Sequence, residues 1–148
     1  KYLNFFKMIL NCMNKIIKSE ELQITIYVED TDFQGFVYHA NYVKFFERAR
    51  SNFLSTIKVS QRELRSKNQA FVIKSINLNY LHAAELGDNL VVYTAVEKKS
   101  NARMIFHQKI RCIDNKREYV NGKVEVCFID LNTKKPKKFP DDLLLIFK

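Results

Sequence analysis

The sequence predicts an α+β domain in which an antiparallel sheet of five strands wraps around one long central helix. Three observations support this fold class. Apolar residues recur every three or four positions over 43–57, which is the spacing of a helix with one buried face. The run over 22–28 alternates apolar with polar residues, as a half-buried strand does, and four later runs are also typical of strands. The order is one strand, one helix and then four meandering strands, so the helix and the sheet are expected to bury each other's apolar faces.

The central helix is expected to begin between His39 and Asn41, after a first strand over 22–28 and a polar loop. Its apolar stripe predicts the face that packs on the sheet. That stripe consists of Val43, Phe46, Ala49, Phe53 and Ile57.

The remaining elements follow from local signals. Ser60 with Glu63 has the spacing of a capping box, which predicts a short second helix over 61–66. Gly122 predicts a bulge in the last strand, and a terminal turn of helix is expected within 140–147. The four later strands are predicted at 71–80, 90–97, 103–113 and 117–130.

The first eighteen residues have an amphipathic helical pattern with lysine and asparagine on the polar side. We therefore divide the chain into an N-terminal amphipathic extension, residues 1–20, and one domain, residues 21–148. The extension is shorter than the roughly 20 mainly apolar residues that span a bilayer. Three interpretations stay open: peripheral contact with an anionic membrane, a helix packed on the domain, or sequence upstream of the domain.

Composition limits the partners and the compartment. The chain has 148 residues and a net charge of +9, which implies an anionic partner or surface. Coenzyme A, an acidic acyl carrier protein, anionic lipid and nucleic acid all satisfy that requirement. Cys12, Cys112 and Cys127 form no CxxC pair and are expected to be free thiols, which favours a reducing cytoplasm. The histidines and cysteines lack metal-ligand spacing, so no metal is expected.

The polar loop before the central helix is the candidate site. It places Asp32 seven residues before His39, which lies where the helix is expected to start. The first N–H groups of a helix lack intrahelical partners and carry partial positive charge, so they can polarise a carbonyl oxygen. A nearby carboxylate could attack that carbonyl or activate a water molecule. The alternative is purely structural, with Asp32 capping the loop and Asn41 acting as the helix N-cap.

The run EDTD-x-x-G-x-V-Y-H-A-N-Y-x-x-F-F-E-R-A-R resembles the signature of hotdog-fold acyl-CoA thioesterases. It is most similar to the 4-hydroxybenzoyl-CoA thioesterase type, in the bacterial subfamily associated with the Tol–Pal envelope system. The resemblance is dense over 29–53 and looser to the C-terminus. It implies that Asp32 is the catalytic carboxylate, that the backbone N–H of His39 polarises the thioester carbonyl, and that its imidazole supports catalysis. The sequence departs from the pattern at Phe33, which is usually small, and at Ala83-Ala84, which is usually Pro-Ala.

The resemblance therefore predicts hydrolysis of a thioester of coenzyme A or acyl carrier protein, with Asp32 as nucleophile or general base. Coenzyme A enters as part of the substrate, and no other cofactor is expected. A homodimer or homotetramer is implied, with the site between protomers. The expected substrate-binding residues are Tyr38, Asn41 and the hairpin cations Lys98, Lys99 and Arg103, which could meet nucleotide phosphates.

Two other functions remain as alternatives. A hotdog dehydratase or hydratase acting on acyl carrier protein would also use a histidine and a carboxylate on its central helix. A non-catalytic basic module for RNA or an anionic membrane is the second. Nucleic acid is not the expected partner, because the aromatic residues follow buried periodicity and are not interleaved with basic ones on an exposed face.

Overall fold

The computed structural model describes residues 16–148 and contains six strands and three α-helices over that range. A single 3-10 turn, η1 (Val28–Asp30), precedes the loop that leads into the long helix. The elements are β1 (Ile16–Lys18), β2 (Leu22–Thr25), α2 (His39–Thr56), α3 (Gln61–Ser66), β3 (Gln69–Tyr80), β4 (Asn89–Lys98), β5 (Arg103–Cys112), β6 (Glu118–Asp130) and α4 (Asp141–Leu145).

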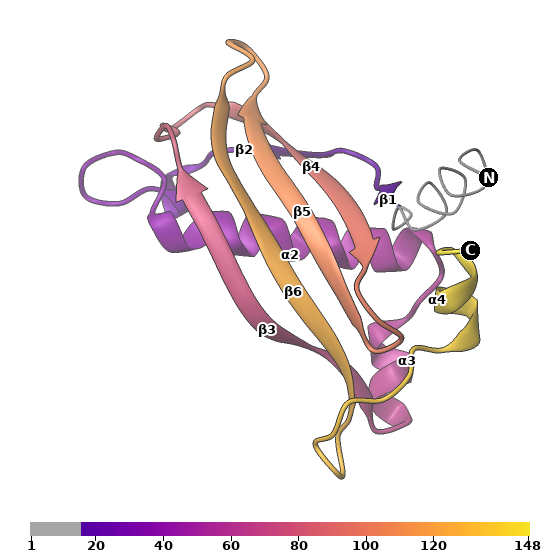
Figure 1. Cartoon of the computed structure of the whole chain (residues 1–148). Helices are drawn as coiled ribbons and strands as arrows, with labels where there is room; N and C mark the ends of the chain where they lie inside the picture. The colour runs from indigo at the N-terminus through magenta and orange to yellow at the C-terminus, as the bar shows by residue number, and fades with distance from the viewer. Residues whose placement is uncertain (1–15) are drawn as a thin grey trace, which may run out of the picture.

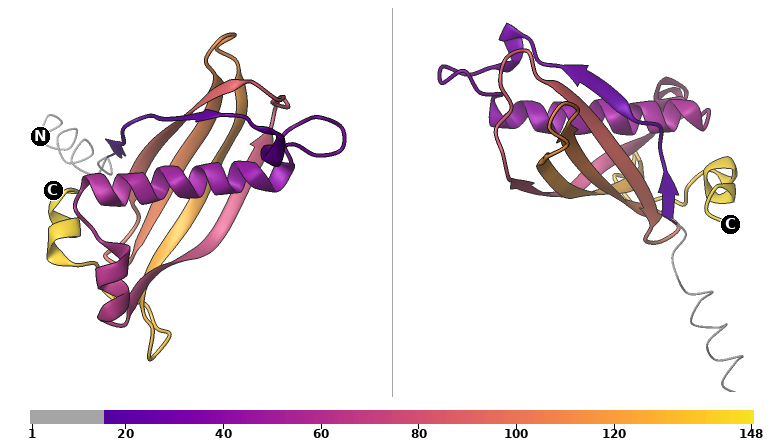
Figure 2. Two further views of the ribbon diagram at one scale, coloured as in Figure 1. Left: turned by 180° about the vertical axis from the view of Figure 1, so that it is seen from behind. Right: turned by 90° about the horizontal axis from the view of Figure 1, so that it is seen from above.

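The strands form one antiparallel sheet in the order β1-β4-β5-β6-β3, with β2 also pairing with β4. The sheet curves around α2, which crosses its concave face (Figures 1 and 2). The α+β hotdog architecture expected from the resemblance is thus confirmed. The C-terminal end of the edge strand β3 and the N-terminal end of α2 lie at the same end of the molecule as the loop over 31–37 (Figure 1).

The prediction of five strands needs one correction. Residues 16–18, which the apolar spacing assigned to a helix, form β1 and pair with Ala95, Val96 and Glu97 of β4. The two segments β1 and β2 therefore make one interrupted edge beside β4. Contacts with a distant strand make these residues a strand and not a helix, because Ile17 packs against the core around Val96. The rest of the predicted N-terminal helix lies outside the described residues.

The predicted face of α2 is confirmed as the core. Phe46, Ala49 and Phe53 are buried against the sheet, whereas Val43 and Ile57 of the predicted stripe are only half-buried. The buried surface is wider than the predicted stripe, since it also includes Tyr42, Phe45 and Leu54. On the sheet, alternate residues of β4 and β5 supply the opposing layer: Leu90, Val92, Val96, Met104, Phe106 and Ile110.

Gly122 does not form the predicted bulge. It pairs in register with Leu78 of β3 and Gln108 of β5, while the irregularities occur between Ile73 and Ser75 and between Ile110 and Arg111. A Cβ at position 122 would overlap the Asn77 carbonyl oxygen and the Leu78 side chain. The glycine is therefore required by close approach of β3 and β6.

The peripheral elements follow the local sequence. Ser60 caps α3, its hydroxyl accepting the Glu63 N–H at 3.2 Å. Cys112 and Cys127 are buried free thiols, as predicted. Within residues 16–148, no helix combines the length and the apolar character needed to cross a membrane.

Candidate active site

The loop over 31–37 is fixed at both ends beside the start of α2. Thr31 and Val37 form an antiparallel bridge across its base. The Asp30 carbonyl oxygen then accepts two hydrogen bonds at 2.9 Å, one from the Tyr38 N–H and one from the Asn41 side-chain amide. These hydrogen bonds join the base of the loop to the first turn of α2, and the loop projects from the end of the molecule (Figure 1).

Asp32 closes this loop. Its Oδ1 accepts the N–H groups of Gln34 at 2.9 Å and Phe36 at 3.3 Å, and its own N–H donates to the Phe36 carbonyl at 2.8 Å. The Gln34 side chain lies on the same carboxylate; with its amide nitrogen turned inward it donates to Oδ1 at 3.0 Å and Oδ2 at 3.2 Å. Asp32 thus has the loop-capping role of the structural alternative. No backbone N–H among residues 16–148 donates to Oδ2, so Oδ1 holds the loop while Oδ2 meets the Gln34 side chain.

The N-terminus of α2 has free donors. Tyr38 is the N-cap, it provides no side-chain cap, and no acidic residue lies in the first turn. The N–H groups of His39 and Ala40 have no hydrogen-bond acceptor among residues 16–148. Two unpaired N–H groups at the positive end of an 18-residue helix form a site for a polarised or negative oxygen.

The side chains of His39 and Tyr38 are exposed at this helix start. Their rings pack against each other with centroids 4.4 Å apart. The His39 carbonyl accepts the Tyr80 hydroxyl at 3.2 Å, which ties the helix start to the end of β3. The His39 imidazole has no hydrogen-bond partner in the described chain, so it is available to a substrate or to water.

Asn41 does not have the N-cap role that the sequence suggested. It is not the N-cap, because α2 begins two residues earlier. Its side chain is 6% exposed and its amide donates to the Asp30 carbonyl. In this structure Asn41 holds the loop, and its direct contact with substrate stays a prediction.

The structure adds supports that sequence reasoning missed. The buried Asp30 carboxylate accepts the Tyr27 N–H at 3.0 Å and stabilises the 3-10 turn before the loop. The Tyr42 hydroxyl accepts the Ala84 N–H at 3.0 Å, and the Ala84 carbonyl accepts the Val37 N–H at 2.8 Å. Burial raises the pKa of Tyr42, so the hydroxyl stays neutral. Asp30 lies within the EDTD motif, but its position in the sequence alone does not show that it supports the turn while Asp32 closes the loop.

Exposed apolar side chains surround the loop. Phe33, the departure from the family pattern, is 102% exposed. Its neighbours on the same end of the molecule are also exposed: Tyr27, Val28, Phe36, Tyr38, Tyr80, Leu81 and Leu86. A patch of this kind on a monomer indicates a ligand or protein contact.

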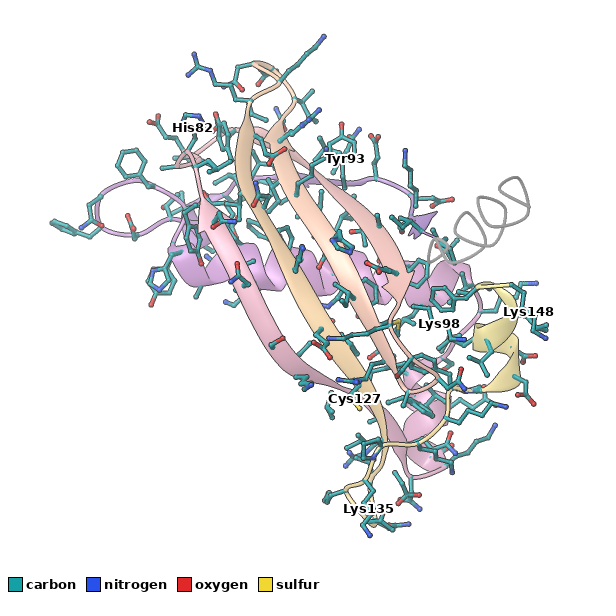
Figure 3. All side chains as sticks on the ribbon, viewed as in Figure 1. His82, Tyr93, Lys98, Cys127, Lys135 and Lys148 are labelled. Atoms are coloured by element: carbon teal, nitrogen blue, oxygen red, sulfur yellow. The ribbon has the colours of Figure 1, made fainter. Side chains whose placement is uncertain are left out.

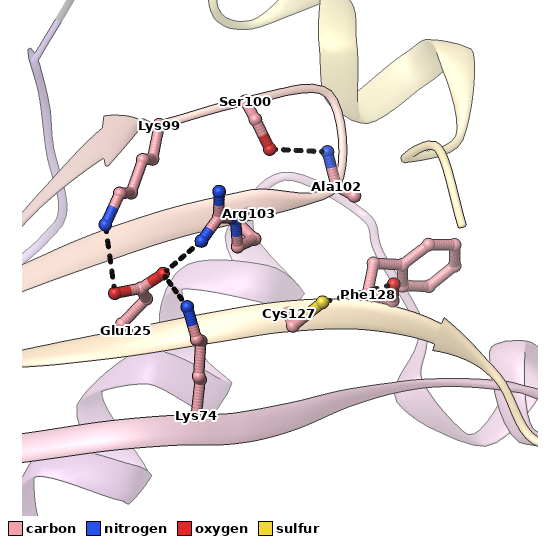
Figure 4. Close-up of polar contacts among 8 residues, drawn as sticks. All are labelled: Lys74, Lys99, Ser100, Ala102, Arg103, Glu125, Cys127 and Phe128. Carbon is pink, nitrogen blue, oxygen red and sulfur yellow. Dashed lines mark hydrogen bonds and ion pairs between the residues drawn. The ribbon is translucent and has the colours of Figure 1, made fainter. Parts of the chain in front are cut away.

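The predicted phosphate-binding cations lie elsewhere. The β4–β5 hairpin is at the α3 end of the molecule, far from the 31–37 loop (Figures 1 and 3). Lys99 and Arg103 are already paired with Glu125, at 3.1 and 3.2 Å, and Lys74 joins them at 3.5 Å (Figure 4). The hydrogen bond from Lys99, with Lys74, lowers the pKa of Glu125. Within one chain, the structure brings Asp32, Tyr38, His39 and Asn41 together and leaves the hairpin cations apart.

A hollow of about 960 Å³ lies on the outer face of the sheet, and the residues that line it include Tyr93, His107, Lys109 and Lys123. None of the predicted site residues lines it. Its size does not make it the site, because neither Asp32 nor the first residues of α2, His39 and Ala40, line it. Among residues 16–148, no three or more His, Cys, Asp or Glu side chains are grouped to hold a metal ion.

Comparison with known proteins identifies the family. Residues 26–147 match the model of the thioesterase-like superfamily. The chain is 38% identical over 125 residues to the acyl-CoA thioesterase YbgC of Haemophilus influenzae, covering 84% of this chain and 90% of that protein. A probable thioesterase from Bartonella henselae superposes with a TM-score of 0.75 at 33% identity, over 82% of this chain and 98% of that one.

The fold is shared more widely. A 1,4-dihydroxy-2-naphthoyl-CoA thioesterase from Synechocystis superposes with a TM-score of 0.82 at 19% identity, over 90% of this chain and 96% of that one. That likeness concerns the fold alone. The match of the family model over most of the chain, together with the motif and the helix-terminus geometry, shows that this chain belongs to the thioesterase-like superfamily.

Proposed function

We propose that the protein hydrolyses acyl-CoA thioesters at the N-terminus of α2. The thioester carbonyl oxygen accepts the N–H groups of His39 and Ala40, and Asp32 acts on the carbonyl carbon or on a water molecule. The observation that carries this proposal is the pair of unpaired helix N–H groups beside a loop-held carboxylate. The YbgC relative named as an acyl-CoA thioesterase supports it.

The reaction needs only groups that the loop supplies. As general base, Asp32 takes a proton from water, the new C–O bond forms, and the C–S bond breaks to release the thiol, which takes up that proton. As nucleophile, Asp32 forms a mixed anhydride with the acyl group while the C–S bond breaks and the thiolate leaves. Water then hydrolyses the anhydride, which returns Asp32 as a carboxylate and releases the acid, and a proton from that water protonates the thiolate. In both routes the negative charge on the carbonyl oxygen is stabilised by the helix N–H groups.

A hydrolysis screen tests the proposal. Short, long and aromatic acyl-CoAs and an acyl carrier protein thioester are offered to the protein, and thiol release is measured. We expect saturable release from at least one acyl-CoA. Dehydration or hydration of the acyl group without thiol release would instead favour the dehydratase alternative.

His39→Ala is expected to reduce turnover less than loss of the Asp32 carboxylate does. The backbone N–H of residue 39 survives the substitution, so only the contribution of the imidazole is lost. A positioned acid–base side chain contributes about 10²–10⁴-fold, and we expect the supporting imidazole of His39 to contribute at the lower end of that range. Steady-state kinetics with the best substrate check this, and a larger loss for His39→Ala than for Asp32→Asn, in a folded protein, would reverse the two roles.

We further propose that the working form is a homodimer or homotetramer in the cytoplasm. The strand β3 ends the sheet, and its twelve residues leave one backbone edge unpaired within the described chain. Exposed Ile73 and Ile76 lie on that strand, and a long apolar edge is a template for a second chain. A partner could then supply phosphate contacts that one chain does not bring to its own loop. The buried free thiols agree with a reducing compartment.

The combined neutralisation of Lys98, Lys99 and Arg103 tests the phosphate contacts. We expect KM for acyl-CoA to rise and kcat to change little. The reason is that phosphate contacts stabilise the bound substrate and the transition state equally. The KM of the unmodified protein should also rise with ionic strength, since exposed charges are screened over about 8 Å at physiological salt. Truncated thioesters without the nucleotide are the control. Equal slowing of truncated and full substrates would exclude the hairpin as a phosphate site.

A further inference from the structure

A second cavity, of about 180 Å³, lies between α2 and β3, well away from the 31–37 loop. Arg50, one of its lining residues, is eleven positions after His39, which is about 16 Å along a helix. The apolar part of the lining consists of Leu54, Phe71, Ile73, Met104, Phe106 and Val126. An apolar cavity of roughly 150 Å³ is known to hold benzene, so this one has room for one ring or a short aliphatic chain.

Arg50 is the unusual member of this lining. It is only 7% exposed, and its Nη1 donates to the Gln108 Oε1 at 3.0 Å. Gln108 is held in turn, because its Nε2 donates to the Phe46 carbonyl and to the Thr94 hydroxyl, each at 3.0 Å. A guanidinium has five N–H donors. Only one N–H group of Arg50 has a hydrogen-bond partner in the described chain. Because Arg50 lines the cavity, its other N–H groups remain available to a ligand there.

The charge on Arg50 has no counter-ion in contact. Among residues 16–148, no carboxylate oxygen lies within 4.0 Å of the guanidinium. Burial lowers the pKa of Arg50, and Glu47 opposes that effect from a distance. Glu47 lines the same cavity, but its carboxylate accepts the Ser51 hydroxyl at 2.6 Å. A buried cation without a paired anion is costly, and an arriving carboxylate would offset that cost.

We propose that this cavity binds the carboxylate of a small aromatic or short aliphatic acid, with Arg50 as its charge partner and the apolar lining around its body. A guanidinium matches a carboxylate with two parallel hydrogen bonds. The apolar lining excludes phosphate or sulfate as the preferred ligand, because they carry no apolar group to bury. Glu47 at the polar side of the cavity weakens binding without preventing it.

The bound carboxylate has two possible sources, and their identification rests on the proposed thioesterase function. One is a free acid of the kind that thioester hydrolysis releases. The other is a carboxylate at the far end of the substrate's acyl group. The binding of benzoate and hexanoate themselves does not depend on that function.

The test is a calorimetric titration of benzoate and of hexanoate into the full chain, with benzyl alcohol as the neutral counterpart of benzoate. We expect saturable, one-to-one binding of both acids and no saturable binding of benzyl alcohol. Arg50→Met should weaken benzoate binding about tenfold or more, as loss of a charged hydrogen bond implies. Arg48→Met is the matched control, since Arg48 is exposed on the same helix over the Phe45 ring, and it should leave the affinity unchanged.

Glu47→Gln supplies a second test that does not disturb the core. Removing this negative charge from an exposed position should tighten benzoate binding several-fold. No benzoate binding to the unmodified protein, equal binding to Arg50→Met and Arg48→Met, or an affinity unaltered by Glu47→Gln would each overturn the proposal. If Arg50→Met fails to fold, as its circular dichroism would reveal, the Glu47→Gln result decides.

Inhibition of thioester hydrolysis by benzoate distinguishes the two sources of the carboxylate. Benzoate binding to an inactive variant tests this proposal separately from the proposed function. Benzoate that raises KM alone shares the site with the acyl group, whereas benzoate that lowers kcat alone binds as a separate free acid. Asp32→Asn, which should remove turnover, should bind benzoate as the unmodified protein does. Loss of benzoate binding in Asp32→Asn would overturn the placement of the acid at Arg50.

Discussion

Replacing Asp32 with asparagine is expected to abolish most thioester hydrolysis while the fold remains intact. Asparagine has the shape of aspartate, and its oxygen can still accept the N–H groups of Gln34 and Phe36 that close the loop. It cannot act as a base or as a carboxylate nucleophile. The loss of a positioned acid–base group corresponds to about 10²–10⁴ in kcat. The measurement is kcat with the best substrate of the screen, together with the melting temperature.

Asp130→Asn is the matched control for this substitution. The Asp130 Oδ1 also accepts two backbone N–H groups of its own turn, from Asn132 and Thr133, each at 2.9 Å. These hydrogen bonds lower the pKa of Asp130, with the Thr133 N–H making the largest contribution. The turn is remote from the 31–37 loop, so turnover should stay at the unmodified level. Normal turnover by Asp32→Asn would exclude Asp32 as the catalytic carboxylate.

Replacing Phe46 with alanine is expected to cause a large loss of stability. The ring is 0% exposed at the centre of α2, in the cluster with Ile26, Val37 and Leu90. Truncation of a buried phenylalanine removes apolar contacts and leaves a cavity, which costs about 3–5 kcal/mol. For a chain of this length that cost corresponds to a fall of roughly 6–20 °C in Tm. Urea denaturation measures the free energy of unfolding.

Phe33→Ala provides the contrast, on the loop that precedes the same helix. Because that ring is fully exposed, its removal should change the free energy of unfolding by no more than about 0.5 kcal/mol. If both substitutions had the same effect on stability, the placement of Phe46 in the core and of Phe33 in solvent would be wrong. An effect of Phe33→Ala on substrate preference alone would agree with a ring that meets the acyl group only when a partner or substrate covers it.

Local pattern was sufficient for most elements. The period of 3.6 residues in α2, the alternation in β4 and β5 and the cap at Ser60 all act over a few positions, so the sequence displays them directly. The motif from Glu29 to Arg50 was also sufficient to place Asp32 in the loop and His39 at the start of the helix that follows it. The sequence pattern failed at β1 and at Gly122, where contacts with residues far along the chain decide the local structure.

The sequence by itself determined the helix-and-sheet order, the buried face of α2 and the position of the loop carboxylate before a helix N-terminus. Only the tertiary structure decided which charges are isolated and which are paired. Glu125 on β6 pairs with Lys74, Lys99 and Arg103, while Arg50 is buried beside Gln108 without a carboxylate in contact among residues 16–148. The physical reason is that charge pairing depends on distance in space. The residues that contact Glu125 or Arg50 in these pairs are separated from them by 22 to 58 positions in the chain. Local periodicity in the sequence does not indicate contacts over such separations.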